Sequence, residues 1–359
     1  MRLLESIRLS KTRQARATSR RDLSPSRLTF PLALNRLGGL TLSIASALGA
    51  VSGAAAAEDA AAYPSKTIQI VVPSESTGSS TMLARAIADK LTASWKVPVV
   101  VLNRPGGSTS VGTSDVARAA PDGYTILLTS SQFNTTPLVQ SVPYDPIKSF
   151  IPLVPITREY TVIAANPAVP ANNLKELVAL AKAKPGAVTY AIANAGSPNH
   201  LAAEHFSTMN GIRMKMIPYK GSGSAITDVI AGQVQLTFNN AFNLGPLIKS
   251  GALKGLAVSG PNRLPSIPNV PTVAESGIED FNGQFWFGTF LPAGVPKPID
   301  DKLAAEINRI VAAPDFQQLT SSVGALQFVS NPEKFAEVVK DELAANATII
   351  KSSGIKISK

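Results

Sequence analysis

The chain has no cysteine among its 359 residues. This absence excludes disulfides, thiolate metal sites, a cysteine nucleophile and a lipid-anchored N-terminal cysteine. Charge is also scarce, at 16% of residues, whereas hydrophobic residues make up 45%. A chain of this length and composition is long enough for two domains with packed cores and is not intrinsically disordered.

The formal net charge of +10 is unevenly distributed along the chain. Residues 1–57 hold nine Lys/Arg and two acids, a net of +7, which leaves 25 Lys/Arg and 22 acids, a net of +3, in residues 58–359. The body of the chain has no basic block and no aromatic residues interleaved with basic ones. We therefore expect no nucleic-acid partner.

The basic N-terminal segment is typical of an export signal. An arginine-rich start is followed by an apolar stretch at 37–50 and by an A-x-A cleavage pattern at 54–57. The apolar stretch is too short and too rich in Gly and Ser for a comfortable membrane span, although an uncleaved anchor is the alternative. We expect residues 1–57 to be cleaved and the mature protein to be periplasmic. Ser19-Arg20-Arg21-Asp22-Leu23 resembles a twin-arginine motif, a route that would require folding before export.

The most informative stretch of the body is MKMIPYKGSGSAITDVIAGQVQLTFNN, at residues 214–240. Its glycine–serine turn leads into a helix, so bare backbone N–H groups should lie at a helix N-terminus, where anions bind. Nothing in the stretch pairs a nucleophile with a base, which favours holding a small acid over converting it. The pattern predicts a strand, a turn, a helix, a glycine stop and a strand, at residues 214–219, 221–224, 225–230, 232 and 234–238.

Strand and helix patterns alternate through the rest of the body. Such alternation predicts an α/β fold with parallel sheets, here in two sets, with ligands at the carboxyl ends of the strands in a cleft between two lobes. Polar residues 129–136 and proline-rich residues 261–271 are predicted loops. Further strands are expected at 68–72, 97–102, 124–128, 161–165, 189–192, 256–258 and 285–291, and helices at 81–91, 111–120, 174–184, 200–210, 299–312, 315–323 and 332–350.

Eight short segments carry a family resemblance when they are taken in order: YPSKTI (63–68), VVVLNRPGG (99–107), ARAAPDGYT (117–125), GSPNHL (196–201), PYKG (218–221), GQVQL (232–236), NVPTVAE (269–275) and WFG (286–288). With them the chain resembles, over about residues 63–355, the periplasmic substrate-binding proteins of tripartite tricarboxylate transporters, the Bug-type solute receptors. The resemblance implies a two-lobed, type II-like periplasmic binding protein fold. Two Rossmann-like α/β domains would close on a small carboxylate in the cleft between them.

The resemblance also implies a domain layout and a role. Crossings near 161–165 and 285–288 would give one lobe from 58–162 plus 286–359 and a second lobe from 163–285. The protein would be a monomeric receptor that delivers a small organic carboxylate to membrane transporter subunits. It would need no metal or cofactor and would not be an enzyme. A receptor that signals to a sensor protein has the same fold, so that role stays open.

The sequence departs from the family where ligand would be held. The first loop usually reads PFPPGGGTD, but residues 73–81 here read PSESTGSST. Thr81 therefore replaces an aspartate, and Glu75 supplies a different carboxylate. The family's later Asp-Asn pair is Asn239-Asn240 here. Hydroxyls and amides should dominate the site, so aliphatic di- and tricarboxylates, amino acids and aromatic acids all remain candidate ligands.

Candidate ligand-binding residues come from four places along the chain. Each group has an alternative role: Ser80 or Thr81 as a helix cap, Glu75 as an ammonium partner or a solvated side chain, and Tyr219 and Phe133 as core residues. The candidates are Glu75, Ser76, Thr77, Ser79, Ser80 and Thr81 in the first loop, Ser131, Gln132 and Phe133 after a strand of the first lobe, Gly196, Ser197 and His200 after a strand of the second, and Tyr219 and Asn239 flanking the glycine–serine turn.

Patterns for other chemistries are weak or missing. His200, Glu204 and His205 read H-x-x-x-E-H, which fits neither H-E-x-x-H nor H-x-x-E-H. Residues 78–81 lack the lysine of a phosphate-binding loop, and residues 221–223 lack the third glycine of a dinucleotide fingerprint. An α/β enzyme would need a nucleophile–base pair or a metal, and neither histidine has an evident serine partner.

Overall fold

The computed structural model describes residues 61–353, apart from 77, 220, 282 and 323, so the predicted export signal lies outside the described residues. Within the described part, no helix is long and apolar enough to cross a membrane. In chain order the elements are β1 (Ile68–Val72), α1 (Ser79–Trp95), β2 (Val99–Asn103), η1 (Gly107–Thr109), α2 (Ser110–Ala117), β3 (Thr125–Ser130), α3 (Gln132–Val139), β4 (Phe150–Ala165), α4 (Leu174–Ala183), β5 (Thr189–Ile192), α5 (Pro198–Met209), β6 (Lys215–Pro218), α6 (Ser222–Ile230), β7 (Leu236–Asn240), α7 (Ala241–Lys249), β8 (Lys254–Val258), β9 (Gln284–Pro292), α8 (Lys297–Val311), α9 (Pro314–Ser322), β10 (Leu326–Gln327) and α10 (Pro332–Ser353).

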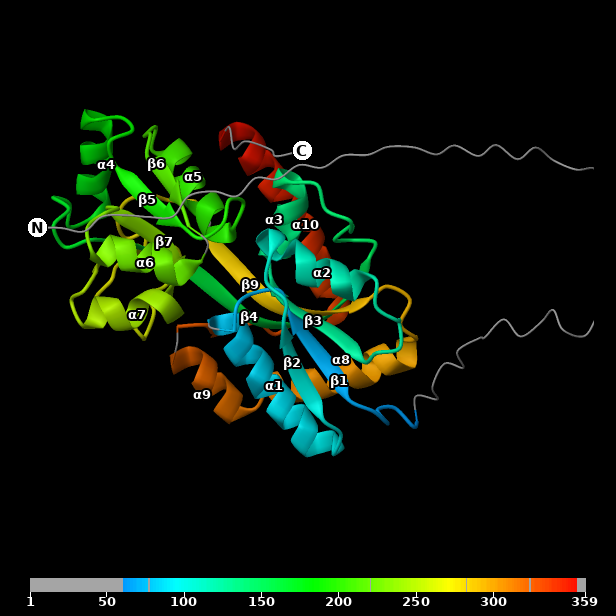
Figure 1. Cartoon of the computed structure of the whole chain (residues 1–359). Helices are drawn as coiled ribbons and strands as arrows, with labels where there is room; N and C mark the ends of the chain where they lie inside the picture. Colours follow the sequence, from blue (N-terminus) through cyan, green and yellow to red (C-terminus); the bar gives the residue numbers. More distant parts are fainter. Residues whose placement is uncertain (1–60, 77, 220, 282, 323, 354–359) are drawn as a thin grey trace, which may run out of the picture. The chain divides into compact units, whose positions relative to one another are not determined.

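The strands form one hydrogen-bonded path in the order β2-β1-β3-β9-β4-β7-β5-β6, with β8 and β10 also paired to β4 (Figure 1). The pairs β1–β2, β1–β3, β5–β6 and β5–β7 are parallel, as the alternation of strands and helices predicts. The prediction is wrong for β4 and β9, which run antiparallel to each other and to their neighbours. The fold is thus two small parallel sheets joined by a pair of long antiparallel strands.

The first sheet, formed by β1, β2 and β3 with β9, has a hydrophobic cluster on each face. Successive strand residues point to opposite sides, so neighbouring residues belong to different clusters. Ile70 packs with α1 and α8, whereas the adjacent Val71 packs with the aromatic cluster that includes α10. Phe285 and Phe287 of β9 join the first side, and Trp286 joins the second. Burial on both faces explains why these strands read as apolar runs and not as alternating patterns.

The second sheet is covered in the same manner by helices from the middle of the chain. Ile163 and Tyr190 face a core that includes α4 and α5, whereas the adjacent Val162 and Ala191 face a core that includes α6 and α7. These two cores contain described residues from 160–281 only, and the cores of the first sheet contain residues up to 156 and from 285 onward. In addition, Val139 and Ile350 pack against Leu201 of α5.

The strand predicted at 161–165 begins eleven residues earlier, at Phe150, because β4 spans Phe150–Ala165. The added part of the strand contains Pro152 and Pro155. Both prolines lie where the pairing of β4 with β9 shifts register. A bulge is a position where a strand tolerates proline, since no ladder hydrogen bond is needed from its nitrogen.

The polar loop predicted at 129–136 is wrong, because β3 continues to Ser130 and Gln132 begins helix α3. The segment QFNTTPLV lacks helical apolar spacing and contains Pro137. Its polar side chains are nevertheless buried, and two of them reach partners outside the helix: Thr136 Oγ1 lies within hydrogen-bond distance of the Ser108 carbonyl as well as the Gln132 carbonyl, and Asn134 Nδ2 donates to the Val339 carbonyl. Tertiary hydrogen bonds, which no local pattern reveals, therefore select this helix.

The strand–turn–helix–strand pattern predicted at 214–240 is confirmed as β6, α6 and β7. Gly232, at φ +76°, supports the left-handed turn that follows α6. The two strands of this unit are not neighbours, because β5 lies between them and pairs in parallel with both.

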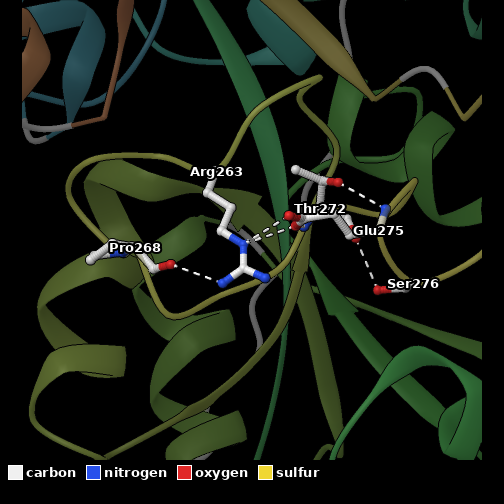
Figure 2. A network of polar contacts seen from close by, with 5 residues as sticks. All are labelled: Arg263, Pro268, Thr272, Glu275 and Ser276. Atoms are coloured by element: carbon white, nitrogen blue, oxygen red, sulfur yellow. Dashed lines mark hydrogen bonds and ion pairs between the residues drawn. The ribbon is translucent and has the colours of Figure 1, made fainter.

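The proline-rich loop after β8 is held at its end by a reciprocal hydrogen-bond pair (Figure 2). Thr272 Oγ1 accepts from the Glu275 backbone N–H at 3.0 Å, and the Glu275 carboxylate accepts from the Thr272 N–H at 2.6 Å. Arg263 Nε donates to the same carboxylate at 2.9 Å, and its Nη1 donates to the Pro268 carbonyl. The Glu275 carboxylate therefore links Arg263, near the start of the loop, to Thr272 at its end.

Candidate functional site

A cleft of about 1150 Å³ opens where the parallel strands of both sheets reach their carboxyl ends. Open α/β sheets bind ligands at this edge because the strand-to-helix loops and the helix N-termini converge there. Phe285 and Phe287 of β9 contribute aromatic surface. Other lining residues lie at the ends of strands or after them: 73–76 and 78–82 after β1, 128–130 and 132 at the end of β3, 193, 194 and 197–199 after β5, 221–223 after β6, and 239, 240, 242 and 243 at the end of β7.

The structure brings most of the predicted site residues to this cleft, but not all of them. Eight line it: Glu75, Ser76, Ser79, Ser80, Thr81, Gln132, Ser197 and Asn239. Five do not belong to the lining: Ser131, Phe133, Gly196, His200 and Tyr219. Thr77 lies outside the described residues.

The first loop is fixed by its own side chains. Thr81 is 1% exposed, its hydroxyl donates to the Glu75 carbonyl at 3.1 Å, and it accepts from Asn103 Nδ2 at 2.8 Å. Ser74 and Ser80 share a hydrogen bond of 2.8 Å. Thr81 therefore shapes the loop, and its hydroxyl proton is already committed to a protein partner.

Two helices point uncapped N-termini at the cleft. Helix α1 follows Gly78, which has φ +110°, and helix α6 follows Gly221; neither residue supplies a side-chain cap. The first N–H groups of each helix thus lack the side-chain acceptor that usually satisfies them. By contrast, α5 is capped, because Ser197 Oγ accepts from the His200 N–H at 3.2 Å.

Gln132 provides a buried donor with nothing to donate to. The residue is 8% exposed and lines the cleft at the start of α3. Its Nε2 has no hydrogen-bond partner among the residues that the structure describes. An amide nitrogen left unpaired in a buried position costs about 1–3 kcal/mol, so the arrangement favours an acceptor supplied by a ligand.

The amides after β7 are oriented by the start of α7. Asn239 Oδ1 accepts from the Asn240 N–H and from Asn243 Nδ2, each at 2.9 Å, which leaves Asn239 Nδ2 as its remaining donor. Asn240 caps α7, because its Oδ1 accepts from the Asn243 N–H at 3.2 Å. Helix α7 itself is absent from the sequence-based expectations.

Phe133 and Ser131 belong to the protein interior and not to the cleft. Phe133 is fully buried and packs against Tyr144, Phe150, Trp286 and Phe290. Ser131 is also fully buried, and its N–H donates to the Trp286 carbonyl. For Phe133 the core role that the sequence left open is the one that the structure shows.

Three predicted residues between 196 and 219 form hydrogen bonds with neighbouring residues and do not line the cleft. His200 is 4% exposed, its Nδ1 accepts from the Gly196 N–H at 3.0 Å, and burial lowers its pKa to about 4. The imidazole is therefore neutral and carries its proton on Nε2, 3.8 Å from Glu204. The hydroxyl of Tyr219 donates to Asp228 at 2.6 Å. The Gly196 carbonyl accepts from Thr135 Oγ1.

Sequence reasoning missed Arg85 and Asn243, and it noted Asn240 beside Asn239 without making it a candidate; all three line the cleft. Arg85 follows Thr81 by one helical turn, so the spacing along α1 was the signal that could have found it. The two asparagines could have been found as an N-cap followed three residues later by its partner, had α7 been recognised.

The site can hold an anion by neutral donors, and Arg85 is the one cation in the lining among the residues that the structure describes. Hydroxyls, amides and helix N-termini surround the space, together with Arg85 and the carboxylate of Glu75. Glu75 Oε2 lies 3.7 Å from where a Cβ would stand on Gly221, so this carboxylate is close to the start of α6. Within the described part of the chain, no three His, Asp or Glu side chains are grouped to hold a metal ion.

Comparison with known proteins finds one matching family and several similar chains. The model of the tripartite tricarboxylate transporter family receptor matches residues 83–355. The Bordetella pertussis protein BugT is 34% identical over 311 residues, covering 86% of this chain and 95% of its own length.

Solved structures are similar over most of the chain. The periplasmic binding protein BugD is 34% identical with a TM-score of 0.75, covering 82% of this chain and 99% of its own. An R. palustris protein with adipate is 29% identical with a TM-score of 0.77, covering 82% and 99%. MatC from Rhodopseudomonas palustris with bound malate is 25% identical with a TM-score of 0.74, covering 80% and 100%.

Proposed function

The chain belongs to the family of tripartite tricarboxylate transporter receptors, and on that premise we propose that it captures a small organic carboxylate in its cleft and delivers it to the membrane subunits of such a transporter. The observation that carries this proposal is the buried, unpartnered amide nitrogen of Gln132 in the cleft lining. A carboxylate oxygen is the acceptor that would satisfy it. Ligand-bound relatives support the class, since one holds adipate and another malate.

Neutral donors can hold such a ligand without a dedicated cation. A carboxylate that accepts several N–H and O–H hydrogen bonds stays ionised and bound, because charge-assisted hydrogen bonds are the strong ones. Ser79, Gln132 and Asn239 present such donors from α1, α3 and the end of β7. The N-termini of α1 and α6 add backbone N–H groups and a favourable dipole.

We also propose the division into lobes at 58–162 plus 286–359 and at 163–285. Support comes from the hydrophobic cores, which separate between Ile156 and Tyr160 and again between Phe281 and Phe285. Strands β4 and β9, which carry both crossings, would act as the hinge when the lobes close. A periplasmic location, a monomeric state and the absence of catalysis belong to the same proposal; the similarity to receptor proteins supports the location and the absence of catalysis.

The test is native mass spectrometry of protein purified from the periplasm, followed by denaturation to identify any retained small molecule. We expect one carboxylate per chain. If the protein is empty, a thermal-shift screen of acetate, benzoate, malate, adipate, citrate and amino acids follows, and failure of every acid to stabilise the protein would refute the proposal. Chemical turnover of a bound acid would instead indicate an enzyme.

A further inference from the structure

A buried carboxyl group lies directly beneath the cleft. Glu159 belongs to β4 and is 3% exposed. Its Oε2 accepts from Asn240 Nδ2 at 2.8 Å, whereas its Oε1 has no hydrogen-bond partner in the described part of the chain. A buried carboxylate normally has a cation or several donors, so this group is unusual.

No charged side chain among the described residues interacts with the Glu159 carboxyl. Glu159 is paired with Phe285 of β9. Arg158, the residue before Glu159, points to the other side of the sheet, where its guanidinium stacks on Phe328. On α1 the nearest charge along the chain, Arg85, is exposed. The remaining charges on α1, α7 and α8 are Asp89 and Lys90 on α1, Lys249 at the far end of α7, and on α8 Asp300 and Asp301 with Lys297, Lys302, and Glu306 with Arg309. Helix α10 also packs on β4 and carries Glu333, Lys334, Glu337, Lys340, Asp341, Glu342 and Lys351.

The hydrogen bonds of Asn240 form a directed chain to the cleft. The Asn243 N–H can only donate, so it fixes Asn240 Oδ1 as the acceptor and Nδ2 as the donor. Nδ2 donates to Glu159 and also to Ser79 Oγ, at 3.3 Å. Since Ser79 Oγ accepts this bond, its own O–H is left to donate elsewhere, and Ser79 lines the cleft.

We propose that Glu159 is a positioning residue: through Asn240 it directs the Ser79 hydroxyl toward the bound carboxylate, and it takes up a proton when that carboxylate binds. The inference rests on the proposed function, because it concerns the same ligand. Protonation would occur at Oε1, the oxygen without a partner. Oε2 then remains an acceptor for Asn240, so the hydrogen-bond chain survives the gain of the proton.

The sign of the pH dependence follows from the burial. Desolvation raises the pKa of Glu159 to about 7 in the empty protein. A ligand carboxylate on Ser79 would be linked to Glu159 by three hydrogen bonds, through Ser79 and Asn240, and like charges raise the pKa further. The complex therefore holds more protons than the empty protein above about pH 7, so affinity falls as pH rises from there. Below that pH the group is protonated in both states, and affinity is flat.

The experiment is isothermal titration calorimetry of the full mature protein from pH 6.0 to 8.5, in buffers of different ionisation enthalpy. The probe is the carboxylate retained from the periplasm or, if none is retained, the strongest stabiliser among acetate, benzoate, malate, adipate and citrate. For the wild type we expect a flat affinity below pH 7, a loss approaching tenfold per pH unit above it, and uptake of up to one proton per ligand.

Three variants separate the roles of charge and hydrogen bonding. Glu159→Gln keeps an acceptor for Asn240 and should bind at all pH values about as well as the wild type does at pH 6, without proton uptake. Glu159→Leu breaks the chain and should bind at least fivefold more weakly than Glu159→Gln at every pH. Glu342→Gln is the matched control, because Glu342 is another glutamate with a pKa raised to about 7, held by Trp286 and outside the cleft lining. It should retain the wild-type pH profile.

Each outcome decides the matter. Ligand binding with no pH slope in the wild type, or a slope that persists in Glu159→Gln, would overturn the role of Glu159 and leave the receptor function intact. If Glu159→Gln fails to fold, proton uptake by the wild type compared with Glu342→Gln still gives the answer. No binding of any probe by the wild type would overturn the proposed function and this inference together.

Discussion

At the scale of the residue, the polar groups of the cleft divide into those already committed to the fold and those that remain available. Thr81 donates its hydroxyl proton to its own loop, and Tyr219 donates to Asp228. Gln132 Nε2 has no such partner among the described residues. A residue's type indicates that it can bind an anion, but only its existing hydrogen bonds show whether it is free to do so.

Removal of the Gln132 amide should weaken ligand binding without loss of the fold. In Gln132→Leu the shape of the side chain is nearly kept and the donor is lost, so we expect a loss of about 1–3 kcal/mol in binding free energy, roughly 5- to 150-fold in Kd. Calorimetry with the retained carboxylate measures it. The control is Gln317→Leu on α9, whose Nε2 bonds the Ala312 carbonyl away from the cleft. Equal affinities in the two variants would remove Gln132 from the site.

Gly196 is required by both backbone and packing. It has φ +75°, and a Cβ added there would stand 2.6 Å from Val139 Cγ2. Gly196→Ala should therefore destabilise the protein by about 2–3 kcal/mol in urea unfolding. Gly186→Ala is the matched control, because Gly186 has φ +80° and nothing within 4 Å of the added Cβ. It should lose only about 1 kcal/mol.

The Val139 contact can be isolated by a double-mutant cycle. Val139→Ala should recover part of the loss in Gly196→Ala, because it removes the atoms that clash with the new methyl group. No recovery in the double variant would show that the strain is in the backbone alone.

At the scale of the element, the sequence predicted the regular structure wherever local pattern and tertiary packing agree. The β6–α6–β7 unit and helices α8, α9 and α10 lie within a few residues of their predicted positions. The failures share a cause: α3, α7 and the first half of β4 each contain proline. The prolines of β4 lie at register shifts, and side chains of α3 bond distant segments; a local pattern contains no information about either.

The segment after β8 depends on Glu275, which serves one backbone N–H and one guanidinium. Those hydrogen bonds, that from Thr272 first, hold the pKa of Glu275 below its usual range. Stability from this group is therefore present above the unfolded pKa and is lost as pH falls through the folded pKa.

We expect Glu275→Ala to lower Tm at neutral pH, and the difference from the wild type to vanish in acid. Thermal unfolding at pH 7 and pH 3 measures both effects. Glu279→Ala serves as the control, since the described part of the chain shows no hydrogen bond or ion pair for this exposed residue. A Tm for Glu279→Ala as low as that of Glu275→Ala would contradict the role given to the Glu275 network.

At the scale of the whole molecule, three buried titratable groups set opposing pH dependences. Desolvation raises the pKa of Glu159 and of Glu342 from 4.5 to about 7, so each makes the protein less stable as pH rises through that interval. Burial lowers the pKa of His200 from 6.5 to about 4, so this group makes the protein less stable as pH falls. Each effect amounts to about 3 kcal/mol.

Urea unfolding of the wild type and two variants at pH 5 and pH 7 should resolve this balance. We expect the wild type to lose stability from pH 5 to pH 7, the single variant Glu342→Gln to be nearly flat, and the double variant Glu159→Gln/Glu342→Gln to gain stability. The three proteins should therefore differ in how their free energy of unfolding changes from pH 5 to pH 7. The same change in all three would mean that the two carboxyl groups titrate normally in the folded protein.

The division of the molecule into a cleft and two sheets could be predicted from the sequence, but the way the sheets are joined could not. Strand β4 pairs with β9 over Phe150–Tyr160 and with β7 over Thr161–Ala165. The partner segments lie more than 70 residues away along the chain, and such long-range pairing leaves no local signal. Glu159 is part of this junction, which explains why no motif pointed to it.

Strand β9 also determines how late in translation the protein can complete its folding. The ribosome makes β1, β2 and β3 early, yet β3 pairs with β9. The hydrophobic cluster of β1 and α1 is completed by α8, at residues 297–311. A nascent chain that ends before residue 284 therefore leaves one edge of β3 and a row of apolar side chains uncovered. We expect prematurely terminated chains to aggregate or to be degraded by proteases, so translation must reach the last quarter of the message before any receptor exists.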